Sequence, residues 1–287
     1  MPASTSKAVL ITGCSTGIGR ATALRLAGAG WTVYATARRP ESIADLEQAG
    51  CKTLALDVTD EDSMDAAVKA VEEAEGAVGV LVNNAGYSQG GPIEQVPMEA
   101  VRRQFETNVF GAIRLTQLVL GGMRGQRWGK IVNVGSMGGR VTFPGGGLYH
   151  ATKYSLEAIS DALRFEVRGF GVDAILIEPG LITSDFAQAA VASTATLDDE
   201  HGTADGAYEQ FNAKVAALTT GVYEGPMRRL GGGPDVVAKA IERAISRRRA
   251  PARVLVTPSA RLTVFQRRLL PDRAWDAAMR VQFPQPR

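Results

Sequence analysis

The stretch Leu10-Ile11-Thr12-Gly13-Cys14-Ser15-Thr16-Gly17-Ile18-Gly19 decides the fold of this chain. It starts in a short apolar run, residues 8–12, whose β-forming residues are typical of a buried parallel strand. A segment with apolar residues at helical spacing follows the glycines. A strand, a glycine turn and a helix in this order suit a dinucleotide, because the backbone can approach a pyrophosphate and the helix N-terminus offers free N–H groups. The spacing is G-x-x-x-G-x-G rather than the commoner G-x-G-x-x-G, and a tight turn that binds nothing is the alternative.

Strands and helices alternate along the rest of the chain. Segments with the composition of strands recur at residues 32–37, 52–56, 78–82, 131–134, 172–178 and 253–256. Segments with apolar residues at helical spacing lie between them, chiefly at residues 41–49, 97–123, 149–169 and 234–248. The alternation predicts an α/β fold, a doubly wound Rossmann fold with a seven-stranded parallel sheet and helices on both faces. We find no internal repeat and no linker, so we expect a single domain over residues 1–287.

Residues 183–230 interrupt this alternation. They mix Ala, Thr, Asp and Gly without a clean strand, which predicts one or two short helices in a mobile lid. The apolar residues available to close over an apolar substrate are Phe186, Tyr208, Phe211, Val215, Leu218, Val222 and Tyr223. Beyond the last strand, residues 259–279 have a helical pattern in which arginines alternate with apolar residues.

The composition excludes several classes of protein. The 287 residues are 45% hydrophobic and 22% charged with a net charge of +2, so we expect no nucleic-acid partner. Two cysteines are too few for a disulfide framework. No apolar run reaches the ~18 residues of a membrane span, and residues 1–7 are too short and polar for a signal sequence. We therefore expect a cytoplasmic protein without a metal site.

The end of the second strand indicates which dinucleotide the chain prefers. An NAD site of this fold usually offers an acidic residue there, to bind the ribose 2′-OH. This chain offers Ala37-Arg38-Arg39 instead. A guanidinium can bind a 2′-phosphate bidentately, which favours NADP(H). Two solvated arginines at a helix start are the alternative.

A tyrosine and a lysine suggest proton transfer. Tyr149 and Lys153 are four residues apart on an expected helix, so both side chains leave the same face. A lysine cation lowers the pKa of a tyrosine from its usual value near ~10, which makes the phenol a possible acid–base group. The pair alone also fits an ordinary amphipathic helix. Ser136 follows the fifth strand, at the sheet edge where ligands bind. Asn108 falls inside an expected helix, where asparagine is disfavoured, and a solvent-facing polar residue is its alternative.

Together these residues resemble the short-chain dehydrogenase/reductase family. The agreement in order and spacing covers roughly residues 7–184, and residues 10–19 and 33–38 are similar to its 17β-hydroxysteroid and retinol dehydrogenase branch. The motifs that carry the resemblance are Thr12-Gly13-x-x-x-Gly17-Ile18-Gly19, Asp57, Asn83-Asn84-Ala85-Gly86, Asn108, Ser136, Tyr149-x-x-x-Lys153 and Pro179-Gly180.

The resemblance implies a hydride-transferring oxidoreductase with a catalytic tetrad of Asn108, Ser136, Tyr149 and Lys153. Ser136 would hydrogen-bond the substrate oxygen, Tyr149 would pass the proton, and Asn108 would anchor a water. The resemblance places the NADP(H) cofactor against Gly13, Ser15, Thr16, Gly17, Ile18, Gly19, Arg38, Asp57, Val58, Asn84, Ala85, Gly86, Tyr149, Lys153, Pro179, Gly180, Ile182 and Thr183. It also implies a homodimer or homotetramer built on residues 97–123 and 148–169. In the first of these segments, Leu115, Leu118 and Val119 are expected to supply more apolar surface than one sheet face needs.

The expected substrate is a hydrophobic ketone or a hydroxysteroid-like alcohol. Other functions of the same fold stay open at this point. They are a 3-oxoacyl reductase-like enzyme, a non-catalytic NADP-binding regulator, and an epimerase or dehydratase. The complete tetrad favours an enzyme over a regulator.

Overall fold

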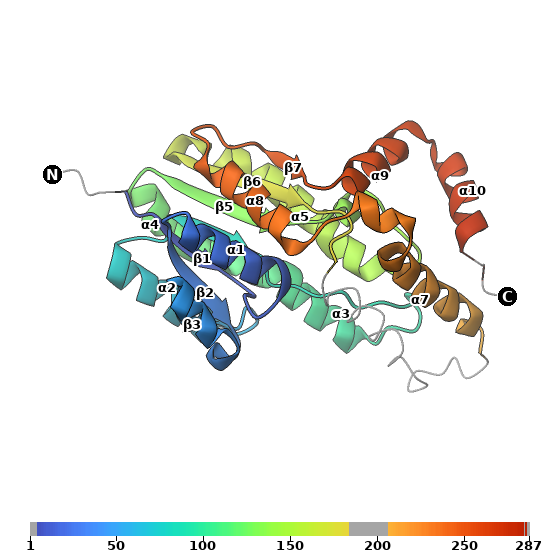
Figure 1. Cartoon of the computed structure of the whole chain (residues 1–287), viewed down its shortest axis with the longest axis horizontal. Helices are drawn as coiled ribbons and strands as arrows, with labels where there is room; N and C mark the ends of the chain where they lie inside the picture. Colours follow the sequence, from blue (N-terminus) through green and yellow to red (C-terminus); the bar gives the residue numbers. More distant parts are fainter. Residues whose placement is uncertain (1–4, 184–205, 284, 286–287) are drawn as a thin grey trace.

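A seven-stranded parallel sheet forms the centre of the molecule (Figure 1). The computed structural model describes residues 5–183, 206–283 and 285. The strand order is β3-β2-β1-β4-β5-β6-β7, which confirms the predicted fold. The strand bounds are β1 (Ala8–Ile11), β2 (Thr32–Ala37), β3 (Lys52–Ala55), β4 (Val80–Asn83), β5 (Gly129–Val134), β6 (Val172–Glu178) and β7 (Arg253–Leu255).

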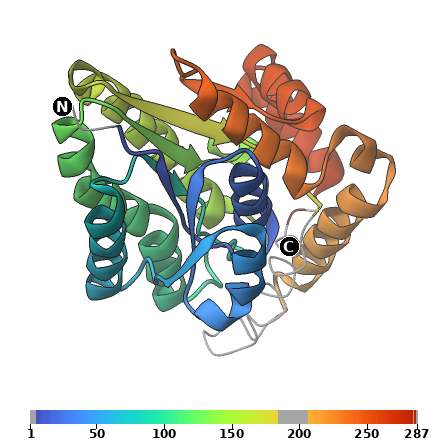
Figure 2. The ribbon, with the colours of Figure 1, turned by 60° about the vertical axis from the view of Figure 1, so that its left-hand side comes forward.

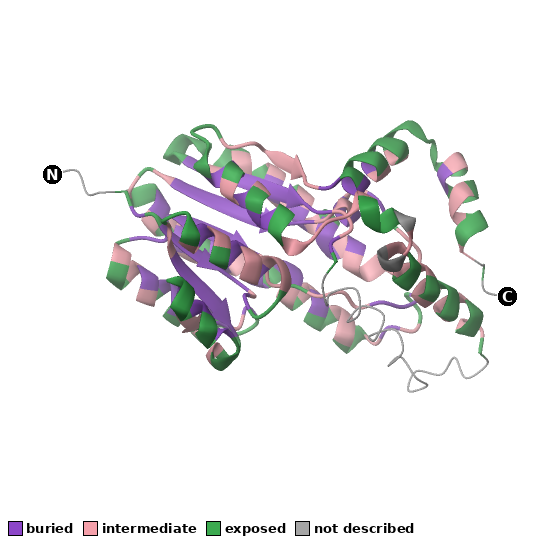
Figure 3. Ribbon diagram, viewed as in Figure 1, coloured by how far each residue is buried: buried purple, intermediate pink, exposed green. Residues whose placement is uncertain are grey.

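Helices cover both faces of the sheet (Figure 2). One face packs against α1 (Gly17–Gly28), the 3₁₀ segment η1 (Pro40–Ala49) and α8 (Pro234–Ser246). The other packs against α2 (Glu61–Glu75), α4 (Gly111–Gly125) and α5 (Gly147–Glu166). The central strands are therefore buried on both sides, while the outer faces of the helices are exposed (Figure 3). This double burial explains why the strands read as continuous apolar runs rather than as alternating ones.

The strand order places a crevice beside the glycine turn. The chain runs from β1 outward to β3 and then returns to β4 on the other side of β1. In such sheets ligands bind outside the carboxyl ends of the strands, at the point where the order reverses. Here that point lies between β1 and β4, so the glycine loop after β1 and the Asn84 loop after β4 face each other.

The helix predicted over residues 97–123 is present, but a π-helical turn divides it into two α-helical parts. It consists of α3 (Met98–Phe105), a π-helical turn η2 (Glu106–Phe110) and α4. Asn108 lies in the π turn and is buried, so the solvent-facing alternative is wrong. The π turn locally widens the helix, and the Asn108 side chain lies in the core although asparagine is unfavourable inside a helix. The helix expected at residues 41–49 is the 3₁₀ segment η1.

The predicted lid is described only in its second half. Residues 184–205, with Phe186, lie outside the described residues. After them come α7 (Glu209–Glu224), one helix longer than those expected, and the 3₁₀ segment η5 (Pro226–Leu230). The tail forms α9 (Pro258–Leu269) and α10 (Asp272–Gln282). Figure 1 shows α7, α9 and α10 at the end of the molecule toward which the strands point.

The apolar surplus expected on α4 is wrong. Leu115 and Val119 are fully buried against the protein's own sheet, and Leu118 is partly buried against the same core, so they offer little to a partner subunit. Exposed apolar side chains lie elsewhere, at Phe110 of η2 and Phe165 of α5, and the homodimer or homotetramer stays a prediction. Separately, none of the helices in the described ranges is long and apolar enough to cross a membrane.

Candidate functional site

The glycine loop after β1 adopts a conformation that requires glycine. Gly13 has φ 71° and Gly17 has φ 58°, in the left-handed region that other residues rarely occupy. Gly19 is needed for a different reason, because a Cβ there would overlap the carbonyl oxygen of Gly13 and press on the Asn84 side chain. The three glycines therefore let the first turn of α1 lie directly against the end of β1.

The N-terminus of α1 is free to bind an anion. Thr16, its N-cap, makes no side-chain capping hydrogen bond, and the first turn carries no acidic residue. The N–H groups of a first helical turn have no partners within the helix, and they carry the positive end of the helix dipole. Ser15 and Thr16 are exposed beside them. The loop can thus hold a pyrophosphate.

Thr12 and Asn84 join the two loops that border the crevice. The Thr12 hydroxyl accepts hydrogen bonds from the N–H groups of Asn84 (3.0 Å) and Ala85 (2.9 Å). In return, the Asn84 side chain donates to the carbonyl oxygens of Thr12 (2.8 Å) and Gly13 (3.1 Å). Asn84 therefore holds the floor of the crevice in place through backbone groups of the glycine loop.

Arg38 and Asp57 lie at the ends of β2 and β3. The N–H of Cys14 donates to Thr36 O (2.8 Å), which brings the glycine loop beside the end of β2. Arg38 is exposed there, and among the described residues its guanidinium has no ion-pair partner. Asp57 uses Oδ1 to accept from the N–H (2.9 Å) and hydroxyl (2.8 Å) of Thr59, and Val58 beside it is buried.

Lys153 lies in the core behind Tyr149. Its ammonium donates to Val134 O at 2.8 Å and lies 5.7 Å from the centre of the Tyr149 ring. Burial lowers the pKa of Lys153 from 10.5 to about 8. At pH 7 the side chain is still mostly cationic, so it can favour the phenolate form of Tyr149. The two side chains share one face of α5, as their spacing predicts.

The Asn108 side chain makes its hydrogen bonds to other residues of the protein and not to a group in the crevice. Its oxygen accepts from the Tyr87 N–H (3.0 Å), and its amide donates to Tyr87 O (2.8 Å) and Thr152 Oγ1 (3.1 Å). Both amide protons are thus in use. Asn108 fixes the loop after β4 to α5, and any water that it anchors must bind its main chain.

Ser136 is positioned by a residue that the sequence did not single out, His150. Ser136 follows β5, and its hydroxyl accepts from the Gly138 N–H at 3.0 Å. The buried His150 ring lies 2.9 Å from Gly138 O through Nδ1, which must carry the proton because a carbonyl only accepts. Burial lowers the pKa of His150, which keeps the ring neutral. His150 thus connects the serine turn to the helix of Tyr149 and Lys153.

The segment after β6 is held by the C-terminal part of the chain. Pro179 O accepts from the Met137 N–H (2.8 Å), next to Ser136. Gly180 packs against the start of α9 so closely that a Cβ would lie 2.5 Å from Ser259 Oγ, and that hydroxyl also accepts from Leu181 N–H (3.1 Å). Ile182 is buried and bridges to Gly232, whereas Thr183 is exposed at the edge of the described residues.

Helix α7 covers the loops above the site. Asn212 donates to Gln95 Oε1 (2.9 Å), and the Tyr208 hydroxyl donates to Glu94 (2.6 Å). Val215 packs on Gly145, where a Cβ would lie 2.7 Å from a valine methyl. Phe211 is half-buried on the same helix. The part of the predicted lid that is described therefore lies beside the loop that leads into the Tyr149 helix.

Two carboxyl groups meet in the core behind the site. Glu178, the last residue of β6, is completely buried, and neither of its oxygens has a hydrogen-bond partner among the described residues. Glu157 on α5 is its neighbour, and Glu157 Oε1 is buried without a partner in the same way. A proton on Glu178 that is directed at Glu157 would give one oxygen of each group a partner. Arg253 donates to Glu157 Oε2 at 2.9 Å, and Arg140 lies 3.6 Å from Glu178.

The structure brings most of the predicted residues to one place. The ends of β1, β2, β4, β5 and β6, the first turn of α1 and one face of α5 supply them. Within the described ranges no group of three or more His, Cys, Asp or Glu residues gathers to hold a metal ion. An acid–base tyrosine, a lysine cation and a serine hydroxyl beside a dinucleotide crevice can serve proton-coupled hydride transfer.

Comparison with known proteins places these motifs in a family. Residues 7–195 match the family model described as short chain dehydrogenase. The chain is 35% identical to the uncharacterized oxidoreductase YusZ of Bacillus subtilis, over 96% of this chain and 97% of the relative. It is 34% identical to an NADPH-dependent 3-dehydrocapnine reductase of Ornithobacterium rhinotracheale (93% and 94%) and 33% identical to a 3-ketodihydrosphingosine reductase of Bacteroides thetaiotaomicron (95% and 96%).

Solved structures give the same result. A short-chain dehydrogenase from Streptomyces avermitilis superposes with a TM-score of 0.75 at 32% identity, covering 97% of this chain and 98% of that one. A serine dehydrogenase complexed with NADP⁺ has a TM-score of 0.73 at 27% identity (88% and 94%). A short-chain dehydrogenase/reductase from Burkholderia phymatum in complex with NAD has a TM-score of 0.76 at 26% identity (92% and 94%).

The buried carboxyl pair predicts how stability depends on pH. Burial, and then the hydrogen bond and charge of Glu157, raise the pKa of Glu178 from 4.5 to about 8. The folded state therefore keeps a proton that the unfolded chain releases, so this contribution to stability is present below pH 4.5 and is lost as the pH rises to about 8. Glu178→Gln is neutral at every pH, and its Tm relative to wild type should rise between pH 5 and pH 9. Glu166→Gln, an exposed change at the end of α5, should follow wild type. A constant difference between Glu178→Gln and wild type would contradict the protonated state of Glu178.

Proposed function

The chain belongs to the short-chain dehydrogenase/reductase family, and we propose that it is an NADP(H)-dependent oxidoreductase acting on a carbonyl or secondary alcohol of a hydrophobic molecule. The observation that carries this proposal is the convergence of Tyr149, Lys153 and Ser136 at the carboxyl edge of the sheet, beside the uncapped helix α1. A regulator that only binds a dinucleotide has no need of an acid–base pair. The tetrad of Asn108, Ser136, Tyr149 and Lys153 is part of the proposal.

The residues of the crevice fit a nicotinamide dinucleotide. The glycine loop and the first turn of α1 would hold the pyrophosphate, and Asp57 and Asn84 would border the adenosine and the floor of the site. Pro179 to Thr183 would line the nicotinamide end. When bound, the cofactor supplies the hydride, and the protein supplies position and charge.

The protein's own residues would manage the proton. The Ser136 hydroxyl lies on the turn fixed by His150 and is placed to donate to the substrate oxygen. Tyr149 would deliver the proton in reduction and remove it in oxidation. Lys153, fixed on Val134 O, would keep a positive charge near the phenol and lower its pKa. A water bound to the main chain of Asn108 would pass the proton to solvent, since the side-chain amide of Asn108 already uses both of its protons in hydrogen bonds.

Arg38 favours NADP(H) over NAD(H). It is exposed beside the glycine loop without a partner in the described chain, and no acidic residue stands at the end of β2. A 2′-phosphate would give the guanidinium two charge-assisted hydrogen bonds. The NADPH-dependent relative supports this choice, while the structural neighbours include complexes of both dinucleotides.

The described part of α7 supports an apolar substrate. Phe211, Val215 and Leu218 are only half-buried, and Val215 lies against the loop before Tyr149. Two relatives are named for reducing 3-dehydrocapnine and 3-ketodihydrosphingosine. We infer that the substrate is a ketone, or the corresponding secondary alcohol, on an apolar or hydroxysteroid-like frame.

Tyr149→Phe tests the assignment of the proton donor. The change removes only the hydroxyl, so turnover should fall by ~10²–10⁴ while cofactor affinity changes little. Steady-state rates measured from NADPH absorbance, with a cofactor titration of the same protein, check both parts. Turnover within about threefold of wild type would remove Tyr149 from the mechanism.

Arg38→Asp tests cofactor choice. A carboxylate in place of the guanidinium repels the 2′-phosphate and accepts a bond from a ribose hydroxyl, so the preference for NADPH should give way to NADH. We expect each kcat/KM to move by about tenfold or more, because a charge-assisted bond is lost. Arg39→Asp, the same change one residue later, is the matched control and should keep the wild-type preference. A wild-type preference for NADH would show that Arg38 does not select the cofactor.

A substrate panel tests the apolar class. With NADPH in excess, bulky apolar ketones should give higher kcat/KM than small charged keto acids, because the half-buried side chains of α7 gain little from a charged ligand. The opposite ranking would refute the substrate class without affecting the assignment of Tyr149.

A further inference from the structure

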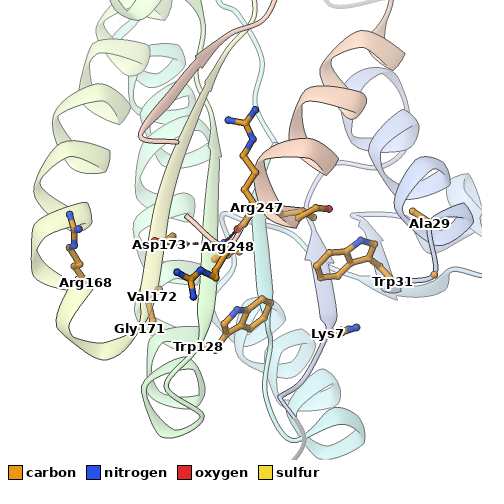
Figure 4. A pocket seen from close by; sticks show the side chains of 14 residues that line it. Lys7, Ala29, Trp31, Trp128, Arg168, Gly171, Val172, Asp173, Arg247 and Arg248 are labelled. Carbon is orange, nitrogen blue, oxygen red and sulfur yellow. Dashed lines mark hydrogen bonds and ion pairs between the residues drawn. The ribbon is translucent and has the colours of Figure 1, made fainter. Parts of the chain in front are cut away.

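A separate cavity of about 610 Å³ lies at the edge of the sheet opposite the dinucleotide crevice (Figure 4). Its walls come from the turn after α1, the starts of β5 and β6, and the end of α8. These are the amino ends of the strands, whereas the glycine loop and Tyr149 lie at the carboxyl ends. We propose that this cavity binds a small organic anion that combines an aromatic ring with a phosphate group, as a nucleoside monophosphate does.

Two tryptophans provide flat apolar surface in the cavity. Trp31 and Trp128 are both half-buried, and both pack against the main core. The Trp128 ring lies over Gly79, where a Cβ would approach it to 2.9 Å. In the described chain neither indole N–H has a hydrogen-bond partner. Each tryptophan can therefore stack on a planar ring and still donate a hydrogen bond.

The backbone before Trp128 is strained. Arg127 has φ 53°, and among the described non-glycine residues it alone has a positive φ. Gly171 (φ 80°) lies so close that a side chain there would collide with the Arg127 carbonyl. A backbone conformation of this kind often marks a functional site. Trp128 follows it directly in the chain.

Most of the charged side chains that line the cavity are cations. Lys7, Arg168, Arg247 and Arg248 line it, and within the described ranges none of them has an ion-pair partner. Asp173 is the acid of the lining, and its Oδ2 accepts from the buried Lys130 ammonium at 2.9 Å. Lys130 neutralises that acid, so four cations remain without a counter-charge in the part of the chain that the structure describes.

Helix dipoles do not account for these cations. The C-termini of α1 and α8 both end at the cavity, and each carries the equivalent of about half a negative charge. Together they balance about one of the four cations. The remaining positive charge, on side chains from separate segments, suits an anion. Arginine binds phosphate through paired N–H groups and stacks on aromatic faces, so a ligand with both an aromatic ring and a phosphate matches both kinds of lining.

The cavity's size fits such a ligand. Its volume of about 610 Å³ lies within the usual range of small-molecule pockets, about 300–1,000 Å³. The proposal does not depend on the proposed reaction, since no residue of the cavity belongs to the dinucleotide crevice.

Calorimetric titration of the full chain with guanosine 5′-monophosphate tests the proposal. The titration is run with one equivalent of NADP⁺, which fills the dinucleotide crevice and leaves no excess to compete for the cavity. We expect one molecule to bind, with an affinity that falls as salt is added. Guanosine alone and inorganic phosphate alone should each bind at least tenfold more weakly. No detectable binding at millimolar nucleotide would overturn the proposal, as would equal affinity for either fragment.

Matched variants locate the binding. Arg247→Ala/Arg248→Ala should weaken binding of the nucleotide about tenfold or more, whereas Arg228→Ala/Arg229→Ala, an equal loss of charge on η5, should not. Tryptophan fluorescence gives a second readout that needs no arginine change. Quenching by the nucleotide should persist in Trp275→Phe and should be lost in Trp31→Phe/Trp128→Phe. Equal weakening by both arginine pairs, or quenching that follows Trp275, would assign the binding elsewhere.

Discussion

The hydrogen bonds between Thr12 and Asn84 are the contact on which the rest of the site depends. Strands β1 and β4 are neighbours in the sheet but are separated by two strands in the chain, so their loops meet only through tertiary packing. One hydroxyl and one amide use four hydrogen bonds to hold the loops together. Gly19 allows α1 to start directly beneath them. The crevice between the loops, the position of the free end of α1 and the start of the loop after β4 all depend on these hydrogen bonds.

Helix α5 carries the proposed catalytic residues Tyr149 and Lys153 and also packs into the core. Tyr149 and His150 stand in its first turn, Lys153 one turn later, and Glu157 one turn after that. Each contacts a different segment: His150 the turn of Ser136, Lys153 the end of β5, and Glu157 the buried end of β6 and Arg253 of β7. Buried charges of this kind are costly unless they are paired or neutralised. The raised pKa of Glu178 favours its neutral form, and Glu157 is paired with Arg253, so both groups beside the helix of Tyr149 meet that condition.

Much of the fold and part of the site follow from local sequence. Apolar runs give the strands, and the i, i+4 spacing gives the common face of Tyr149 and Lys153, because both signals are contained in a few consecutive residues. The π turn at Asn108 is different, since its cause is the hydrogen bonding of the amide to Tyr87 and Thr152 in other segments. Glu178 and Glu157 are 21 residues apart, and no periodicity connects them. Leu115 and Val119 show the same limit, because a count of apolar residues does not say which face they occupy.

The proposed anion cavity and the dinucleotide crevice lie at opposite ends of the same strands. Strand β5 begins beside Trp128 and Lys130 and ends at Ser136, while β6 begins beside Asp173 and ends at Pro179. Their ladder is paired without a break from Gly129 with Val172 to Val134 with Ile177. Coupling between distant sites needs an element with two arrangements that both ligands bias. A continuous and largely buried ladder has one arrangement. The charge of an anion at the amino edge is also offset locally by the arginines around it. Binding at one edge of the sheet should therefore leave the reaction at the other edge unchanged.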